Sequence, residues 1–145
     1  MEQVVIDTSV GLKWIFLHEE GAYQAAHLLL DHLRGRWRLV VPALFYYEAA
    51  NALRHSTNRL TLQQAEAALT HLRGLKLVTH PTSSGLMRCA LEISYQYEVS
   101  LYDAVFVATA LRRGARLVTA DKKAHSKMSG LSFVELLKGT TRIVF

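Results

Sequence analysis

Short runs of apolar, β-branched residues alternate along this chain with longer stretches in which apolar residues follow helical spacing. The clearest run, residues 4–6, contains no polar residue and stops abruptly at Asp7. A strand that is apolar on both faces is typical of a parallel sheet with helices on each side. The pattern recurs in three further runs and in a weaker fifth with two possible positions: residues 39–41, 75–78 and 116–119, then 132–134 or 142–144.

Helical periodicity fills the segments between these strands. Thr61 and Gln64 form a capping box, Gly114 is placed to end a helix, and Pro42 suits the first turn of one. The predicted helices cover residues 10–17, 21–33, 42–54, 61–73, 84–97 and 100–113. This alternation implies right-handed crossovers and an α/β fold, a three-layer α/β/α arrangement around a parallel sheet of four to five strands. A chain of 145 residues suits a single domain, 1–145.

Aspartates directly follow two of the predicted strands. Ligands bind at the carboxyl ends of the strands in such sheets, so Asp7 and Asp121 are expected to emerge together at that edge. Asp103 also lies beside an apolar run, where an unpaired carboxylate is costly to bury. Each aspartate has an ordinary alternative role in helix capping, which for Asp103 is the third-position acid of a capping box opened by Ser100.

Glu48 is harder to explain as a surface residue. Its neighbours from residue 43 to residue 53 are almost all apolar, and no basic residue lies three or four positions away to pair with it. Asn51, one helical turn later, shares its face and is placed to hydrogen-bond the carboxylate or a water, or else is a surface amide.

Four carboxylates gathered at one edge of a sheet repel one another unless a cation is present. An all-oxygen ligand set favours Mg²⁺ or Mn²⁺, which keeps several waters and activates one of them for hydrolysis of a phosphodiester. Thr8, Ser9 and Thr119 stand beside these acids, where their hydroxyls either orient the carboxylates and bind phosphate or act only as caps.

The charge of the chain favours an anionic partner. Lysine and arginine number 17 against 12 acidic residues, which gives a net charge of +5. A basic surface of this kind suits a nucleic acid backbone. The residues proposed to contact it flank Asp121, with ordinary alternatives at a helix end or on a solvated surface: Arg112, Arg113, Arg116, Lys122, Lys123 and Lys127.

In order and spacing, four motifs resemble the PIN-domain ribonucleases, and the compact single-domain form resembles the VapC-type toxins of toxin–antitoxin pairs. The motifs are VIDTS from residue 5, EAANAL from residue 48, YDA from residue 102 and LVTAD from residue 117. The resemblance implies Mg²⁺ or Mn²⁺ dependence, RNA cleavage, a homodimer and inhibition by a VapB-type antitoxin. The residues that match the family pattern are the acids Asp7, Glu48, Asp103 and Asp121, the hydroxyl residues Thr8, Ser9 and Thr119, and the polar Asn51.

The resulting hypothesis is that Asp7, Asp103 and Asp121 hold the metal while Glu48 orients or deprotonates the attacking water. Two related alternatives are a PIN-type RNA-processing nuclease without a toxin role and a non-enzymatic basic module that binds nucleic acid. A phosphatase of the haloacid dehalogenase kind is disfavoured, because its first motif needs a second aspartate where Ser9 stands.

The single cysteine, Cys89, excludes an internal disulfide and suits a reducing cytoplasm. The longest uncharged stretches, residues 39–47 and 104–111, are far shorter than the roughly 20 residues that a membrane span needs. We therefore expect a cytoplasmic protein without a membrane anchor.

Overall fold

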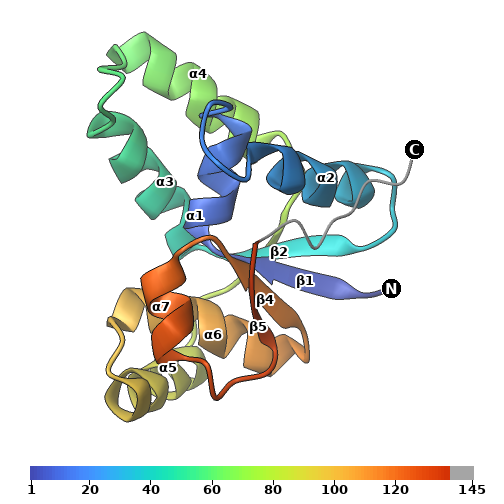
Figure 1. Ribbon diagram of the computed structural model, residues 1–145, viewed down its shortest axis with the longest axis vertical. Coiled ribbons are helices and arrows are strands. Elements are labelled where there is room, and N and C mark those ends of the chain that lie inside the picture. Colours follow the sequence, from blue (N-terminus) through green and yellow to red (C-terminus); the bar gives the residue numbers. More distant parts are fainter. Residues whose placement is uncertain (138–145) are drawn as a thin grey trace.

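A computed structural model describes residues 1–137 and contains a parallel sheet of five strands in the order β3-β2-β1-β4-β5 (Figure 1). The strands are β1 (Gln3–Ile6), β2 (Arg38–Pro42), β3 (Val78–His80), β4 (Arg116–Thr119) and β5 (Val134–Leu136). The helices are α1 (Thr8–Gly11), the short 3₁₀ helix η1 (Leu12–Trp14), α2 (Ala22–Leu33), α3 (Leu44–Arg54), α4 (Leu62–Arg73), α5 (Ser84–Tyr97), α6 (Leu101–Arg113) and α7 (Lys122–Lys127).

Helices cover both faces of the sheet, which confirms the predicted three-layer α/β/α fold. Helices α1 to α4 lie on one side and α5 to α7 on the other (Figure 1). The chain moves outward from β1 to β2 and β3, then returns to place β4 on the opposite side of β1. The strand order therefore reverses between β1 and β4, and ligands of α/β sheets bind beside such a reversal.

The third strand differs from the prediction. It covers Val78–His80 rather than residues 75–78, because Lys76 has a left-handed backbone with φ of 59° that interrupts the extended chain. The carbonyl of Leu75 is instead hydrogen-bonded by the buried His32 ring, whose other nitrogen accepts from Leu39 N. A side chain thus replaces a strand partner at the start of the predicted segment.

Two helix starts and the last strand also need correction. The predicted helix at residues 10–17 is shorter, because α1 gives way to η1, which ends at Trp14. Pro42 is the last residue of β2, paired in register with His80, so α3 begins after it. The weak fifth strand lies at Val134–Leu136, shifted two residues from the first alternative, while the second alternative, 142–144, lies outside the described residues.

Helix α6 is the most deeply buried helix, and it fixes the position of Asp103. Every residue from Ala104 to Ala110 is buried between the sheet and α5. Ser100 caps the helix by accepting a hydrogen bond from the backbone N–H of Asp103 at 3.0 Å, and Gly114 ends it in a left-handed conformation. The capping box at Thr61 and Gln64 of α4 is confirmed.

Substituting Gly11 with alanine is expected to destabilise the fold. The added Cβ would lie 2.6 Å from Cε2 and Cζ of Phe45, a fully buried ring of α3. Overpacking of this kind costs about 1–3 kcal/mol, against a helix-propensity gain of about 1 kcal/mol or less. Urea unfolding measures the net loss.

Gly130→Ala is the matched control, because nothing lies within 4 Å of a Cβ at that position. Equal stability of the two variants would show that the close approach between α1 and α3 carries no constraint.

No helix among residues 1–137 has the length and apolar character needed to cross a membrane.

Candidate functional site

Asp7 and Asp121 lie at the ends of the adjacent strands β1 and β4, joined by a network of hydroxyl groups. The backbone N–H of Asp7 donates to Val118 O at 2.9 Å, which continues the pairing of the two strands. The hydroxyls of Ser9 and Thr119 both donate to Oδ2 of Asp7, at 2.5 Å and 3.3 Å. Ser9 Oγ also accepts from the backbone N–H of Ala120 at 3.0 Å, which ties the two strand ends together.

Both aspartates also cap helices, which is the alternative role that the sequence predicted for them. Asp7 accepts from the backbone N–H of Ser9 at the start of α1, and Oδ1 of Asp121 accepts from Ala124 N at 3.0 Å at the start of α7. Capping uses only one of the two oxygens of each carboxylate. Within residues 1–137, no hydrogen bond reaches Oδ1 of Asp7 or Oδ2 of Asp121. The two roles are therefore compatible.

Glu48 projects from α3 toward the same edge of the sheet. The buried Thr8 hydroxyl, at the start of α1, donates to Oε1 of Glu48 at 2.7 Å. This bond connects residues that are 40 positions apart and holds the carboxylate beside the end of β1. Asn51 is exposed on α3 and makes no hydrogen bond to Glu48 in the described part of the chain, so its predicted role gains no support from a contact.

Asp103 reaches the site from the opposite layer. It lies in the first turn of α6 and lines a hollow of about 220 Å³ that Asp121 also lines. Its position depends on the buried helix behind it rather than on a flexible loop. The structure thus brings two strand ends and two helices, from both sides of the sheet, to one acidic centre.

Burial, and to a smaller extent nearby negative charge, raises the pKa values of Asp7, Glu48 and Asp103. Burial is the main cause of a raised pKa at Asp7, with a smaller rise from the charge of Asp121. Burial also dominates the raised pKa of Glu48, followed by the charges of Asp7 and Asp103, and the Thr8 hydrogen bond opposes the rise. The pKa of Asp103 is raised by burial and then by Asp7 and Asp121. The charges of Asp7, Asp103 and Asp121 each help to raise the pKa of at least one other carboxylate, so these acids lie in one electrostatic environment.

The donor set fits a hydrated divalent cation. No salt bridge in the described residues involves any of the four acids, so their charge is not neutralised by a lysine or arginine contact. Among residues 1–137, no three acidic, histidine or cysteine side chains converge closely enough to form a ready-made ligand cluster. Mg²⁺ needs no such cluster, because it binds through one or two carboxylates and keeps several waters.

The six predicted phosphate-contacting residues separate into two groups. Arg112 and Arg113 end α6, about 15 Å along the helix from Asp103. Arg113 donates to His80 and Gln3, and Arg116 pairs with Glu2 and Glu135 at the start of β4. The structure does not bring these arginines to the acidic centre.

The three lysines Lys122, Lys123 and Lys127 belong to α7, whose first turn follows Asp121. All three are exposed, and Lys123 and Lys127 line the hollow beside Asp103 and Asp121, whereas Lys122 lines a separate hollow next to Lys13. Contact with an anionic substrate at the acidic centre is therefore open to the lysines of α7 and not to the arginines at the far end of α6.

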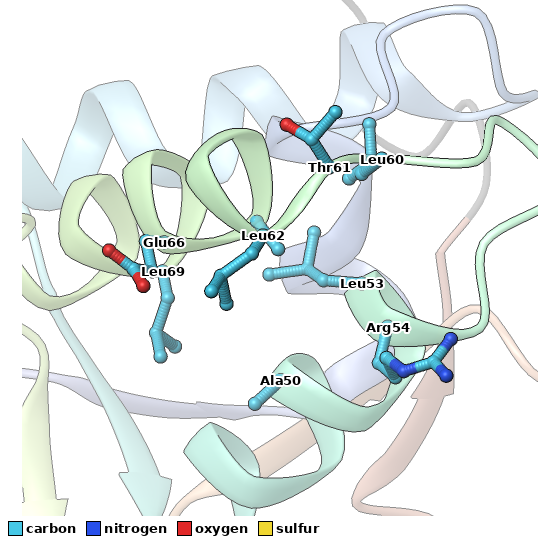
Figure 2. Close-up of a pocket in the computed structure, with 9 residues that line it drawn as sticks. Ala50, Leu53, Arg54, Leu60, Thr61, Leu62, Glu66 and Leu69 are labelled. Carbon is cyan, nitrogen blue, oxygen red and sulfur yellow. The ribbon is translucent and has the colours of Figure 1, made fainter.

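An apolar hollow of about 420 Å³ between α3 and α4 was not predicted from the sequence. Figure 2 shows Leu53, Leu60 and Leu62 around it, with Arg54 and Glu66 at its edge. Leu62 is 75% exposed, an unusual position for a leucine in the first turn of an otherwise polar helix. Leu62 is the sequence feature from which this hollow could have been predicted.

Thr8→Val is expected to shift the acid limb of any activity that depends on Glu48 to higher pH. The Thr8 hydrogen bond stabilises the charged carboxylate, so its loss raises the pKa of Glu48 further and leaves more of it protonated near neutrality. We expect a rate lower by about tenfold at pH 6 and less reduced at pH 8. Thr8→Ser retains the hydroxyl and is the control, and equal pH profiles for both variants would contradict this role.

Solved structures and one family model are similar to this chain. Among curated proteins, none matches the sequence. Among solved structures, VapC20 from Mycobacterium tuberculosis, described as a sarcin-ricin loop cleaving toxin, is 18% identical with a TM-score of 0.69 over 91% of this chain and 97% of that one. VapBC2 from Rickettsia felis, solved with a promoter DNA fragment, is 15% identical with a TM-score of 0.66 over 92% and 96%.

DNA-bound VapBC from Salmonella typhimurium is 15% identical with a TM-score of 0.64, over 94% of this chain and 97% of that one. At these identities the likeness shows a shared fold. The family model described as PIN domain matches residues 4–131, a span that holds all four carboxylates, the strands β2 to β4 and all of β1 except Gln3. The chain belongs to the PIN domain family.

Proposed function

We propose that this protein is a divalent-metal-dependent endoribonuclease that acts as the toxin of a VapBC-type pair. The observation that carries the proposal is the acidic centre, where burial and the charges of neighbouring carboxylates raise the pKa values of Asp7, Glu48 and Asp103. None of the four acids forms a salt bridge with a lysine or arginine in the described chain. Structural packing alone does not favour such a group, since each carboxylate makes the others harder to ionise. The family of the chain and its basic charge support RNA as the substrate.

Asp7, Asp103 and Asp121 would hold Mg²⁺ or Mn²⁺, directly or through water. The bound ion would lower the pKa of a water and offset the charge that develops on the phosphoryl oxygens. The hydroxyls of Ser9 and Thr119 keep Asp7 in one orientation, because both donate to the same oxygen.

Glu48 is the general base in this proposal. Its raised pKa makes it a better proton acceptor than an ordinary carboxylate, and Thr8 binds only Oε1, so no hydrogen bond in the described residues occupies Oε2. Glu48 takes a proton from water as the water oxygen bonds to phosphorus. The bond from phosphorus to the 3′ oxygen breaks, and the departing 3′ oxygen takes a proton from a solvent water, which leaves 5′-phosphate and 3′-hydroxyl ends.

The test is cleavage of a single-stranded RNA by the purified chain. We expect cleavage with Mn²⁺ or Mg²⁺, complete loss with EDTA, and recovery when the metal is returned. Binding of RNA without cleavage under any of these conditions would favour the non-enzymatic module instead. Cleavage without growth arrest on expression would favour an RNA-processing role over a toxin role.

We infer a VapB-type antitoxin as the partner, with an amphipathic helix seated in the apolar hollow between α3 and α4. The hollow continues into a second one of about 540 Å³ lined by Tyr46, Tyr47 and Arg73, since Ala50 and Leu69 line both. Arg54 and Arg73 beside these leucines favour a helix with acidic flanks. The solved complexes that share this fold support the same partner class, and we propose a homodimer as the toxin unit.

A further inference from the structure

We propose that the hollow between α7 and the turn joining α5 to α6 binds a second RNA phosphate, next to the one that is cleaved. The hollow has a volume of about 220 Å³. Its polar lining consists of two carboxylates, two ammonium groups and one hydroxyl: Asp103, Asp121, Lys123, Lys127 and Ser100. This inference rests on the proposed nuclease function and assigns a substrate contact to named residues.

The two lysines are not held by carboxylates. Lys127 Nζ donates to the backbone carbonyl of Glu98 at 3.3 Å, which directs the side chain across the hollow and leaves the rest of its ammonium hydrogens free. Neither Lys123 nor Lys127 forms a salt bridge within residues 1–137, although Asp103 and Asp121 line the same hollow. The charge of Lys127 lowers the pKa of Asp103, so the two groups attract each other across the hollow without a direct salt bridge.

A metal bound by the acids changes the charge of this hollow. If Asp103 and Asp121 bind a divalent cation, their attraction for the two ammonium groups is weakened, and both ammonium groups can then donate to an anion. An anion in the hollow would balance the charge of the two ammonium groups. A phosphate suits this role because it accepts hydrogen bonds from several donors at once. Because the hollow opens onto the acidic centre, the nearest phosphate available is one in the same RNA strand as the scissile group.

The walls of the hollow are fixed before substrate arrives. Ser94 Oγ donates to Val99 O at 2.6 Å, and Glu98 has a left-handed backbone with φ of 55°, so the turn has one defined shape. Ser100 Oγ accepts from Asp103 N, which leaves its hydroxyl hydrogen free to donate. A preformed pocket of this kind holds the strand in one orientation relative to the attacking water.

The experiment measures single-turnover cleavage of a short RNA with a known cleavage site, in Mn²⁺. The variants are Lys123→Met with Lys127→Met, the conservative pair Lys123→Arg with Lys127→Arg, and the charge control Arg34→Gln on the exposed end of α2. Two substrates are compared, one natural and one with a neutral methylphosphonate linkage adjacent to the cleaved phosphate.

The methionine pair is expected to lose about tenfold in kcat/KM on the natural RNA, which the arginine pair restores and Arg34→Gln does not show. The neutral linkage should slow the unaltered protein by a similar factor, and slow the methionine pair little further, because the contact is already gone. Additive losses from the linkage and the lysines would overturn the proposal, as would a methionine pair that cleaves at the rate of Arg34→Gln. Failure of the unaltered protein to cleave at all would refute the nuclease function itself.

Discussion

Replacing Asp7 by asparagine is expected to lower the rate of RNA cleavage by about a thousandfold while the protein stays folded. Asp7 contributes a carboxylate charge that burial disfavours and that the proposed metal ion requires. Asparagine keeps an oxygen that can still accept from the Ser9 backbone at the start of α1, so the cap survives while the charge is lost. Cleavage kinetics and circular dichroism measure the two properties separately.

Asp31→Asn is the matched control for this variant. Asp31 is the one aspartate of the sequence outside the proposed site, and it pairs with Arg36 near the end of α2 at 3.5 Å. We expect the Asp31 variant to cleave RNA at the unaltered rate. A folded Asp7→Asn protein that retains metal-dependent cleavage would remove Asp7 from the mechanism.

Mn²⁺ is expected to stabilise the protein, and Asp103→Asn to abolish most of that stabilisation. A ligand at a hundred times its Kd stabilises the folded state by about 2.7 kcal/mol, which for a chain of this size raises Tm by roughly 5–10 °C. Asp103→Asn removes one ligand and leaves the Ser100 cap in place, since the backbone N–H makes that bond. Thermal unfolding with and without Mn²⁺ measures the difference.

Without metal, Asp103→Asn should raise the stability of the protein rather than lower it. The pKa of Asp103 is raised by burial and by the charges of Asp7 and Asp121, so the folded protein holds this proton to higher pH than the unfolded chain does. Stability therefore falls as pH rises from the ordinary pKa of an aspartate through the raised one, and the loss is complete above it. At pH 8 the metal-free Asp103→Asn protein should be slightly more stable, by about 1 kcal/mol or less because the group is partly exposed.

The metal titration separates the proposed site from a purely structural cluster. Equal Mn²⁺ stabilisation of Asp103→Asn and the unaltered protein would exclude Asp103 as a ligand. No response to Mn²⁺ in either protein would favour a basic binding module without a metal.

The parts of the site that depend on local sequence were predictable. Asp7 and Asp121 follow apolar strands, and any parallel sheet brings strand ends of that kind to one edge. Glu48 was identified because its helix offers it no ionic partner, and the structure gives it the Thr8 hydroxyl instead. In these cases the residue type and its immediate neighbours already carried the physical constraint.

Features set by tertiary packing were not predictable. The arginines at residues 112–116 are close to Asp121 in sequence, yet α6 runs away from the acidic centre and carries them to the opposite edge of the sheet. The third strand begins later than predicted, because Lys76 has a left-handed backbone and His32 of α2 hydrogen-bonds the carbonyl of Leu75. The hollows beside α7 and between α3 and α4 arise from helices that meet only in the folded chain.

The pairing of β1 with β4 also sets when the acidic centre is completed during synthesis of the chain. The two strands are neighbours at the centre of the sheet, but the hydroxyl of Thr119 that bonds Asp7 comes from a residue 112 positions later in the chain. While the ribosome makes the first three strands, the nascent chain lacks Asp103 and Asp121 and leaves one edge of β1 unpaired. The acidic centre proposed to cleave RNA is therefore incomplete until residue 121 has been added to the chain.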